Sequence, residues 1–243
     1  MVHSNGRKVP QWRVRHRGEV DMGRLRRFLG HAANRLLYES LSSNAWFLTK
    51  NALRPLGRAG LYFIYKKDLT GPHEPIRAKV PVEVKLTSAA EFEEAARLDG
   101  GNDAHRERLR AWWRLGHKCF VALAGSRVVA TGWLGFREVR QLTFSVVLDD
   151  DEAYLTGAHT AKAWRGKGIH SELEDRRMAY AKTAGYRTVY VVISADNGRS
   201  GRSFHGRGWE RSGAVLFFRR AGARRARIWC LRGSPHPCRT FCA

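Results

Sequence analysis

Arg165-Gly166-Lys167-Gly168-Ile169-His170 joins an apolar run to a helical pattern, and this short stretch decides the fold. The apolar run covers Ala153 to Ala158 and has the character of a strand, while Ser171 to Thr183 has the spacing of a helix. A strand, a glycine turn and a helix start present free backbone N–H groups and a positive dipole end to an anion. The stretch therefore predicts a site for a phosphorylated cofactor.

The glycine spacing disfavours two common phosphate-binding motifs. It lacks the Gly-x-x-x-x-Gly-Lys-Ser/Thr pattern of a P-loop and the third glycine of a dinucleotide fingerprint. The sequence therefore disfavours nucleotide hydrolysis and hydride transfer as functions. A phosphate-binding turn of another kind remains.

In two blocks the sequence resembles the GNAT superfamily of acyl-CoA-dependent N-acyltransferases. The family's cofactor motif is Arg or Gln, two residues, Gly, one residue, and Gly or Ala. Arg165, Gly168 and His170 occupy these positions, with His170 in place of the small residue. The second block has Asn after the next strand, then a small residue, an aromatic residue and a Gly-aromatic pair at set spacings. Its members are Asn197, Ser200, Phe204, Gly208 and Trp209.

The resemblance covers roughly Val82 to Arg232 and implies a GNAT-like α+β fold. The residues point the same way, because a strand meander followed by a β-α-β segment indicates a mixed, mostly antiparallel sheet flanked by helices. Thr87 or Ser88 caps the first helix of this region, with Glu91 available for a capping box. We expect residues 1–58 to form a basic N-terminal helical extension, 59–232 the acyltransferase domain and 233–243 a disordered tail.

The charge of the chain indicates an anionic partner or surface. The net charge is +22, and 34 of the 44 basic residues are arginines. Leu25 to Leu36 has the spacing of a basic amphipathic helix, which either packs on the main domain or lies on a membrane surface or partner. No apolar stretch is long enough to span a bilayer, and the N-terminus lacks the apolar segment of a signal peptide. The expected location is cytoplasmic, with membrane-peripheral binding possible through the basic N-terminus.

The resemblance implies that acetyl-CoA is the acyl donor and that its pyrophosphate binds the N–H groups at the helix start. Gly166 and Gly168 let the backbone approach closely, and Arg165 and Lys167 add charge from the side. In the family, the pantetheine arm runs beside the preceding strand. The cofactor-binding residues predicted in this way are Ala158, His159, Thr160, Arg165, Gly166, Lys167, Gly168, Ile169, His170, Ser171, Asn197, Ser200 and Phe204.

Two departures from the family concern the catalytic groups. Some members carry a carboxylate eleven residues before the motif arginine, and that position is Tyr154 here. Glu152 lies two residues earlier on the same strand face and is the preferred general base, with Glu138 and His159 as further candidates. The family's usual acid is a tyrosine four residues before the Gly-aromatic pair, but Phe204 occupies that position. The thiolate proton must therefore come from another source.

The preferred function is transfer of an acetyl group from acetyl-CoA to a primary amine by direct attack in a ternary complex. The acceptor is a small molecule or a polymer, and an amino sugar and a tRNA are both open. The alternative is a catalytically weak protein of the same fold that binds nucleic acid or another anionic polymer through its Arg-rich ends. The four cysteines have no metal-site spacing, so no metal is expected.

Overall fold

The computed structural model describes residues 41–72, 74–98, 103–141, 144–223, 226–231 and 241–242. Most of the predicted extension over 1–58, including its amphipathic helix, lies outside these residues, as does most of the 233–243 tail. Helix α2 (Leu41–Ala52) and the first residues of strand β1 (Gly57–Asp68) belong to the predicted extension. In the ranges described, no helix is long and apolar enough to cross a bilayer.

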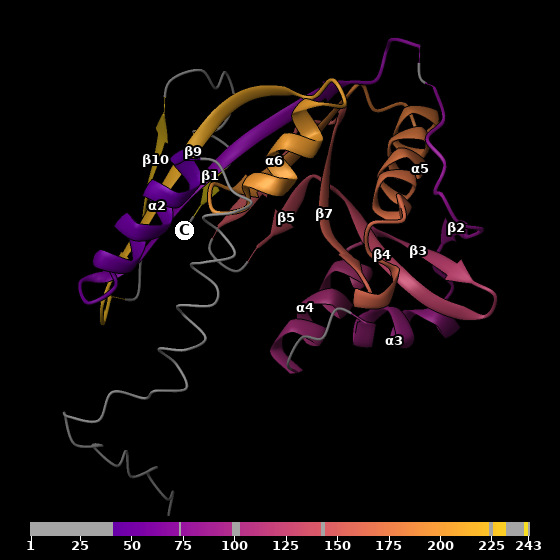
Figure 1. The fold of residues 1–243 in the computed structure, drawn as a ribbon, viewed down its shortest axis with the longest axis horizontal. Helices are drawn as coiled ribbons and strands as arrows, with labels where there is room; N and C mark the ends of the chain where they lie inside the picture. Colours follow the sequence, from indigo (N-terminus) through magenta and orange to yellow (C-terminus); the bar gives the residue numbers. More distant parts are fainter. Residues whose placement is uncertain are drawn as a thin grey trace, which may run out of the picture. The chain divides into compact units, whose positions relative to one another are not determined.

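A mixed sheet forms the centre of the protein (Figure 1). Besides β1, its strands are β2 (Glu83–Leu86), β3 (Lys118–Ala124), β4 (Arg127–Phe136), β7 (Glu152–Thr160), β8 (Thr188–Ser194), β9 (Glu210–Arg220) and β10 (Arg227–Leu231). The strand order is β10-β9-β1-β8-β7-β4-β3-β2. Among the described strand pairs only β7 and β8 run parallel. The predicted fold class, a mostly antiparallel sheet flanked by helices, is confirmed.

Helices cover the two faces of the sheet and create two cores. Helices α3 (Ala89–Leu98) and α4 (Asp103–Arg114) lie on one face, and α5 (Ile169–Thr183) lies on the other (Figure 1). Successive strand residues point to opposite faces. Phe120 of β3 accordingly belongs to the core beneath α5 and α6 (Gly198–His205), while Cys119 belongs to the core beneath α3 and α4. Cys119 is 1% exposed, so its thiol is buried in this core.

Strands β1 and β9 extend beyond their apolar runs. The runs 61–65 and 214–218 mark only the central parts of the two strands, which pair from Gly57 opposite Arg220 to Lys66 opposite Glu210. Their charged ends are extended because a neighbouring strand supplies hydrogen bonds, and Arg58 pairs with Arg219 in this way. A second small sheet contains β5 (Glu138–Arg140), β6 (Ser145–Val147) and β11 (Phe241–Cys242). Strand β11 falls within the segment predicted to be a disordered tail.

The predicted capping box at the start of α3 is present. The backbone N–H of Ser88 donates to Glu91 Oε2 at 2.9 Å, and the N–H of Glu91 donates to Ser88 Oγ at 3.4 Å. We expect Ser88→Ala to lower the free energy of unfolding by about 1 kcal/mol, because the helix loses one side-chain acceptor. Urea denaturation measures this change. Ser126→Ala, in the exposed β3–β4 turn, is the control, and an equal loss there would contradict the assignment.

Candidate functional site

Strands β7 and β8 run side by side at one end and separate at the other. Their parallel register runs from Glu152 opposite Thr188 to Leu155 opposite Val191. Both strands continue beyond these residues without pairing with each other. The facing backbone groups past Leu155 are therefore not paired across the gap, so an extended chain could bind between the two strands as another strand would.

A bulge at Gly157 bends β7 at the point of separation. Gly157 has φ 56°, and the register with β4 shifts between Thr131 and Trp133. A Cβ at position 157 would lie 2.9 Å from Trp133 Cδ1, so only glycine fits there. The bulge re-aims the C-terminal half of β7 and so keeps the gap between the strands open.

A cavity of about 190 Å³ occupies the gap between β7 and β8 and reaches α5 and α6. Ligand pockets commonly measure roughly 300–1,000 Å³, so this one suits the end of a chain-like ligand better than a whole cofactor. His159 and Thr160 lie outside its lining and pair with β4 instead. The predicted cofactor residues that line the cavity are Ala158, His170, Asn197, Ser200 and Phe204.

The turn before α5 presents a series of free backbone donors. Gly166 and Gly168 both have φ 79°, and Gly168 is the N-cap of α5. In the part of the chain that the structure describes, no acceptor is found for the N–H groups of residues 166–170. The N–H of Ser171, by contrast, donates to Gly168 O at 3.0 Å. Successive free N–H groups at a helix N-terminus can bind an anion, and phosphate binding at this turn stays a prediction.

The side chains of the turn hold its shape and supply positive charge. Ile169 is 1% exposed and anchors the helix start in the core. Arg165 donates from Nε to Thr160 O at 3.0 Å, and Lys167 Nζ lies 4.5 Å from the centre of the Trp164 ring. Both basic side chains are thus next to the free N–H groups, where they favour binding of an anion.

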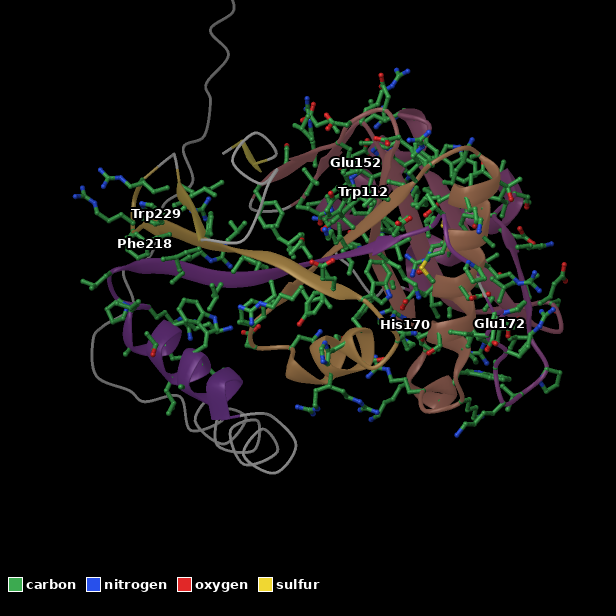
Figure 2. The ribbon with its side chains drawn as sticks, turned by 90° about the horizontal axis from the view of Figure 1, so that it is seen from above. Trp112, Glu152, His170, Glu172, Phe218 and Trp229 are labelled. Atoms are coloured by element: carbon green, nitrogen blue, oxygen red, sulfur yellow. The ribbon has the colours of Figure 1, made fainter. Side chains whose placement is uncertain are left out.

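A second segment, residues 77–79, is fastened to this turn by the buried carboxylate of Glu172. Glu172 Oε2 accepts from the N–H of Ala78 at 2.8 Å, and Oε1 pairs with Arg77 Nη1 at 3.2 Å. The N–H of Lys79 donates to Lys167 O at 2.8 Å. Figure 2 shows Glu172 on α5, near the turn. These contacts fix the conformation of the turn and add basic side chains beside it.

Below the cavity, buried charges connect α5 to the segment after α6. Glu174, 1% exposed, accepts from Arg207 Nη2 at 2.6 Å and from Trp209 Nε1 at 2.9 Å. Burial raises the pKa of the Glu174 carboxyl, and the charges of Arg207 and Arg177 oppose this rise. Arg177 is also 1% exposed, and its Nη1 donates to the carbonyl of Thr156 at 3.3 Å. Charged side chains are rarely buried to this extent unless they are paired.

His170 lines the cavity and differs from the small residue of the family motif. Its Nε2 lies 4.0 Å from Glu174 Oε2. The His170 side chain is 40% exposed, and its partial burial, together with the charges of Arg177 and Arg207, lowers the pKa of the imidazole to about 4. Its imidazole is therefore neutral at pH 7, and it brings no positive charge to the cavity.

The lowered pKa of His170 predicts a specific loss of stability in acid. The unfolded chain binds the proton at pH values near 6.5, whereas the folded protein resists it until about pH 4. The free energy of unfolding should therefore fall as the pH decreases from 6.5 to 4, and less so in His170→Gln. Urea denaturation at pH 7 and pH 5 measures the difference. His205 is exposed on α6, so the control variant His205→Gln should retain the acid sensitivity of the wild type. If His170→Gln also retained it, the interpretation would be wrong.

The predicted catalytic residues lie on the sheet face opposite α5. Figure 2 shows Glu152 on the side of Trp112, with His170 on the other side of the sheet. Glu152 Oε1 accepts from Tyr190 Oη at 2.9 Å, and Oε2 accepts from the N–H of Asp149 at 3.0 Å. Tyr154 is 3% exposed, and burial raises its pKa. Neither Glu152 nor Tyr154 lines the cavity, and their catalytic roles stay predictions.

The two further candidate bases also lie away from the cavity lining. Glu138 begins β5 and pairs with Arg140 Nε at 3.1 Å on the surface. His159 is half-buried in β7, opposite Thr131 of β4. Neither residue lines the cavity, and neither does Glu152, so the structure favours neither of them over Glu152.

Two parallel strands that separate beside a helix N-terminus can hold an extended ligand with an anionic group. The model of the acetyltransferase (GNAT) family matches residues 86–209, and the chain belongs to this family. No curated protein matches the sequence.

Solved structures resemble this chain at low sequence identity. A GCN5-related N-acetyltransferase from Sphaerobacter thermophilus matches with a TM-score of 0.50 and 14% identity, over 75% of this chain and 57% of its own. A putative GNAT acetyltransferase from Novosphingobium aromaticivorans matches with 0.49 and 15%, over 65% and 63%. A functionally unknown protein from Staphylococcus epidermidis matches with 0.48 and 15%, over 70% and 66%. The chain thus spans less than two thirds of each of these proteins.

Three buried charged residues of α5, Arg177, Glu174 and Glu172, were not among the predicted site residues, and only the position of Arg177 carried a signal in the sequence. Arg177 falls four residues after the fully buried Leu173 and eight after Ile169, on the apolar stripe of α5. A charge on a buried helical stripe indicates either a partner or a functional site. Glu174 and Glu172, one on either side of Leu173, are buried on the same helix and gave no such local signal.

Proposed function

We propose that this protein is an N-acetyltransferase that transfers an acetyl group from acetyl-CoA to a primary amine. The observation that carries the proposal is the continuity of two features, the free N–H groups of residues 166–170 and the cavity between β7 and β8. The first suits a pyrophosphate, and the second suits a narrow arm that ends in a thioester. Both belong to the segment matched by the acetyltransferase family.

The residues present fit this cofactor. A Cβ added at Gly166 would have no other atom within 4 Å, so the space beside the turn is open for a phosphate. Asn197 caps α6 by accepting from the N–H of Ser200 at 3.2 Å, and both residues line the cavity. The unpaired edges of β7 and β8 would bind the arm through backbone hydrogen bonds. When bound, acetyl-CoA supplies the activated acyl group, and the protein supplies position and charge.

The acceptor amine is expected to approach from the face that carries α3 and α4, because α5 and α6 cover the other face. On that face Gln141 Nε2 donates to Thr156 Oγ1 at 3.0 Å, next to the point where β7 leaves β8. The hydrogen-bonded pair of Glu152 and Tyr190 lies farther along the same face. Only the neutral amine can attack the thioester. We assign removal of the proton from the ammonium form to Glu152, acting through water.

Two measurements test the proposal in order. Calorimetric titration of acetyl-CoA into the purified protein should show micromolar binding. Release of free thiol should then accelerate when a suitable amine is added from a panel of amino sugars, polyamines, amino acids and aminoacylated or unmodified tRNA. Absence of acetyl-CoA binding to the folded protein would overturn the proposal, unless a longer acyl-CoA binds in its place.

A second function, binding of an anionic polymer, is favoured by one group of arginines. Arg58 of β1 and Arg219 of β9 lie directly opposite each other. Arg227 of β10 lies opposite Phe218 of β9, the neighbour of Arg219. Like charges across a strand pair are unfavourable, and no carboxylate of the described residues is paired with these three arginines. Binding of RNA with a steep salt dependence, without acetyl-CoA binding, would support this function in place of the first.

A further inference from the structure

Arg177 places a buried guanidinium beside the cavity. Its side chain is 1% exposed, and it lines the cavity where β7 separates from β8. Nε donates to Leu173 O at 3.2 Å, and Nη1 donates to Trp133 O at 3.0 Å and to Thr156 O at 3.3 Å. No partner among the described residues accepts from Nη2. One end of the guanidinium therefore retains hydrogen-bonding capacity beside the cavity.

No other described side chain of the lining offers a positive charge or an acidic proton. The lining includes hydroxyl, amide and apolar side chains, besides Arg177 and His170. His170 is neutral at pH 7, because its pKa is about 4. Phe204, 5% exposed, stands where the resemblance to the family leads us to expect a phenol. The residue that supports the leaving group must therefore be a different one.

We propose that Arg177 stabilises the thiolate that leaves coenzyme A during acetyl transfer, an inference that rests on the proposed function. The amine nitrogen bonds to the acyl carbon, the carbon–sulfur bond breaks, and the sulfur keeps the electron pair. The amine proton passes to water, and the thiolate is reprotonated from water on release. A fixed cation in a site of low dielectric stabilises the charge that develops on sulfur.

Arg177 acts by its charge and not as an acid. Burial lowers its pKa to about 10, while Glu174 opposes this change, so the guanidinium remains protonated at neutral pH. A neighbouring arginine lowers the pKa of a thiol, as known for reactive cysteines. The pKa of the bound coenzyme A thiol is therefore a direct readout of the proposed role.

A structural role has to be separated from the catalytic one. A Cβ at Gly132 would lie 2.8 Å from Arg177 Cζ, so the guanidinium also fills space beside the bulge of β7. Loss of that filling would weaken folding and binding. In a complex that still forms, however, loss of this filling would not change the pKa of the bound thiol. This difference makes the inference testable.

The first experiment uses the wild-type protein alone. The ultraviolet absorbance of the thiolate is followed against pH in the coenzyme A complex, with the desulfo-coenzyme A complex as the blank. The blank removes the titration of groups that face Arg177, namely Glu174, Arg207, His170 and Cys119. We expect the bound thiol to titrate at least one pKa unit below the thiol of free coenzyme A in the same buffer, so that affinity for coenzyme A relative to desulfo-coenzyme A rises about tenfold with pH. A bound thiol with an unshifted or raised pKa overturns the inference.

Variants then assign the shift to the guanidinium. Arg177→Gln should return the bound thiol to a pKa near or above the free value, and Arg177→Lys should retain part of the shift. Adding Phe204→Tyr to Arg177→Gln should restore part of the transfer rate, because a phenol then reaches the same cavity. An identical thiol pKa in wild type and Arg177→Gln contradicts the inference but leaves the proposed function intact. Failure of both ligands to bind the wild type removes both proposals.

Discussion

Gly166→Val is expected to weaken coenzyme A binding about 100-fold or more. Gly166 has φ 79°, and its N–H belongs to the free donors of the turn before α5. Since nothing in the protein lies within 4 Å of an added Cβ there, the valine side chain would enter the space reserved for the phosphates. Loss of one or two hydrogen bonds to a charged group, roughly 1.5–3 kcal/mol each, corresponds to that factor. Calorimetric titration measures it.

Gly185→Val is the matched control for this prediction. Gly185 has φ 91°, its Cβ position is also open, and it lies past the other end of α5. Both variants force a side chain into the left-handed region and should lose a similar 1–2 kcal/mol or so of folding stability. Only Gly166→Val should lose affinity. Equal affinities in the two variants would show that the turn does not bind the phosphates.

Glu174→Leu is expected to lower the free energy of unfolding by about 3–5 kcal/mol. The substitution removes the partner of Arg207 and of the Trp209 indole and leaves two buried donors unsatisfied. Breaking a buried pair costs this much because the remaining charge stays in a medium of low dielectric. The same change loosens the attachment of α5 to the segment that follows α6, so the cavity should lose its shape. Urea denaturation measures the stability.

Glu210→Leu provides the exposed counterpart. Glu210 pairs with Lys66 at 3.4 Å, and its side chain is 70% exposed. Surface ion pairs contribute roughly 0–1 kcal/mol, so this variant should unfold close to the wild type. If the two variants lost equal stability, the pair at Glu174 would not be the connection that the structure indicates.

The parts of the fold that local sequence dictates were predictable. The capping box of Ser88 and Glu91 is a contact across three residues, and it forms as expected. The glycine turn before α5 is likewise a local feature, since φ near 79° at Gly166 and Gly168 requires glycine. Apart from strand β5, the order of strands and helices between 83 and 231 followed from periodicity, and with it the fold class.

The parts set by long-range packing were not predictable in the same way. The gap between β7 and β8 depends on the bulge at Gly157 meeting Trp133 of another strand. Arg177 gains its role from carbonyls of β4 and β7, 44 and 21 residues away. The strand face of Glu152 was foreseeable from alternation, but its hydrogen bond with Tyr190 required the parallel partner strand.

Hydrogen–deuterium exchange with and without coenzyme A locates the bound cofactor on the protein. If coenzyme A binds between β7 and β8 with its phosphates on the turn, amides of residues 166–170 and of β7 beyond Leu155 should exchange more slowly in the complex. Helices α3 and α4 should exchange as before. Protection confined to α3 and α4, or binding without any protection at the turn, would contradict the account.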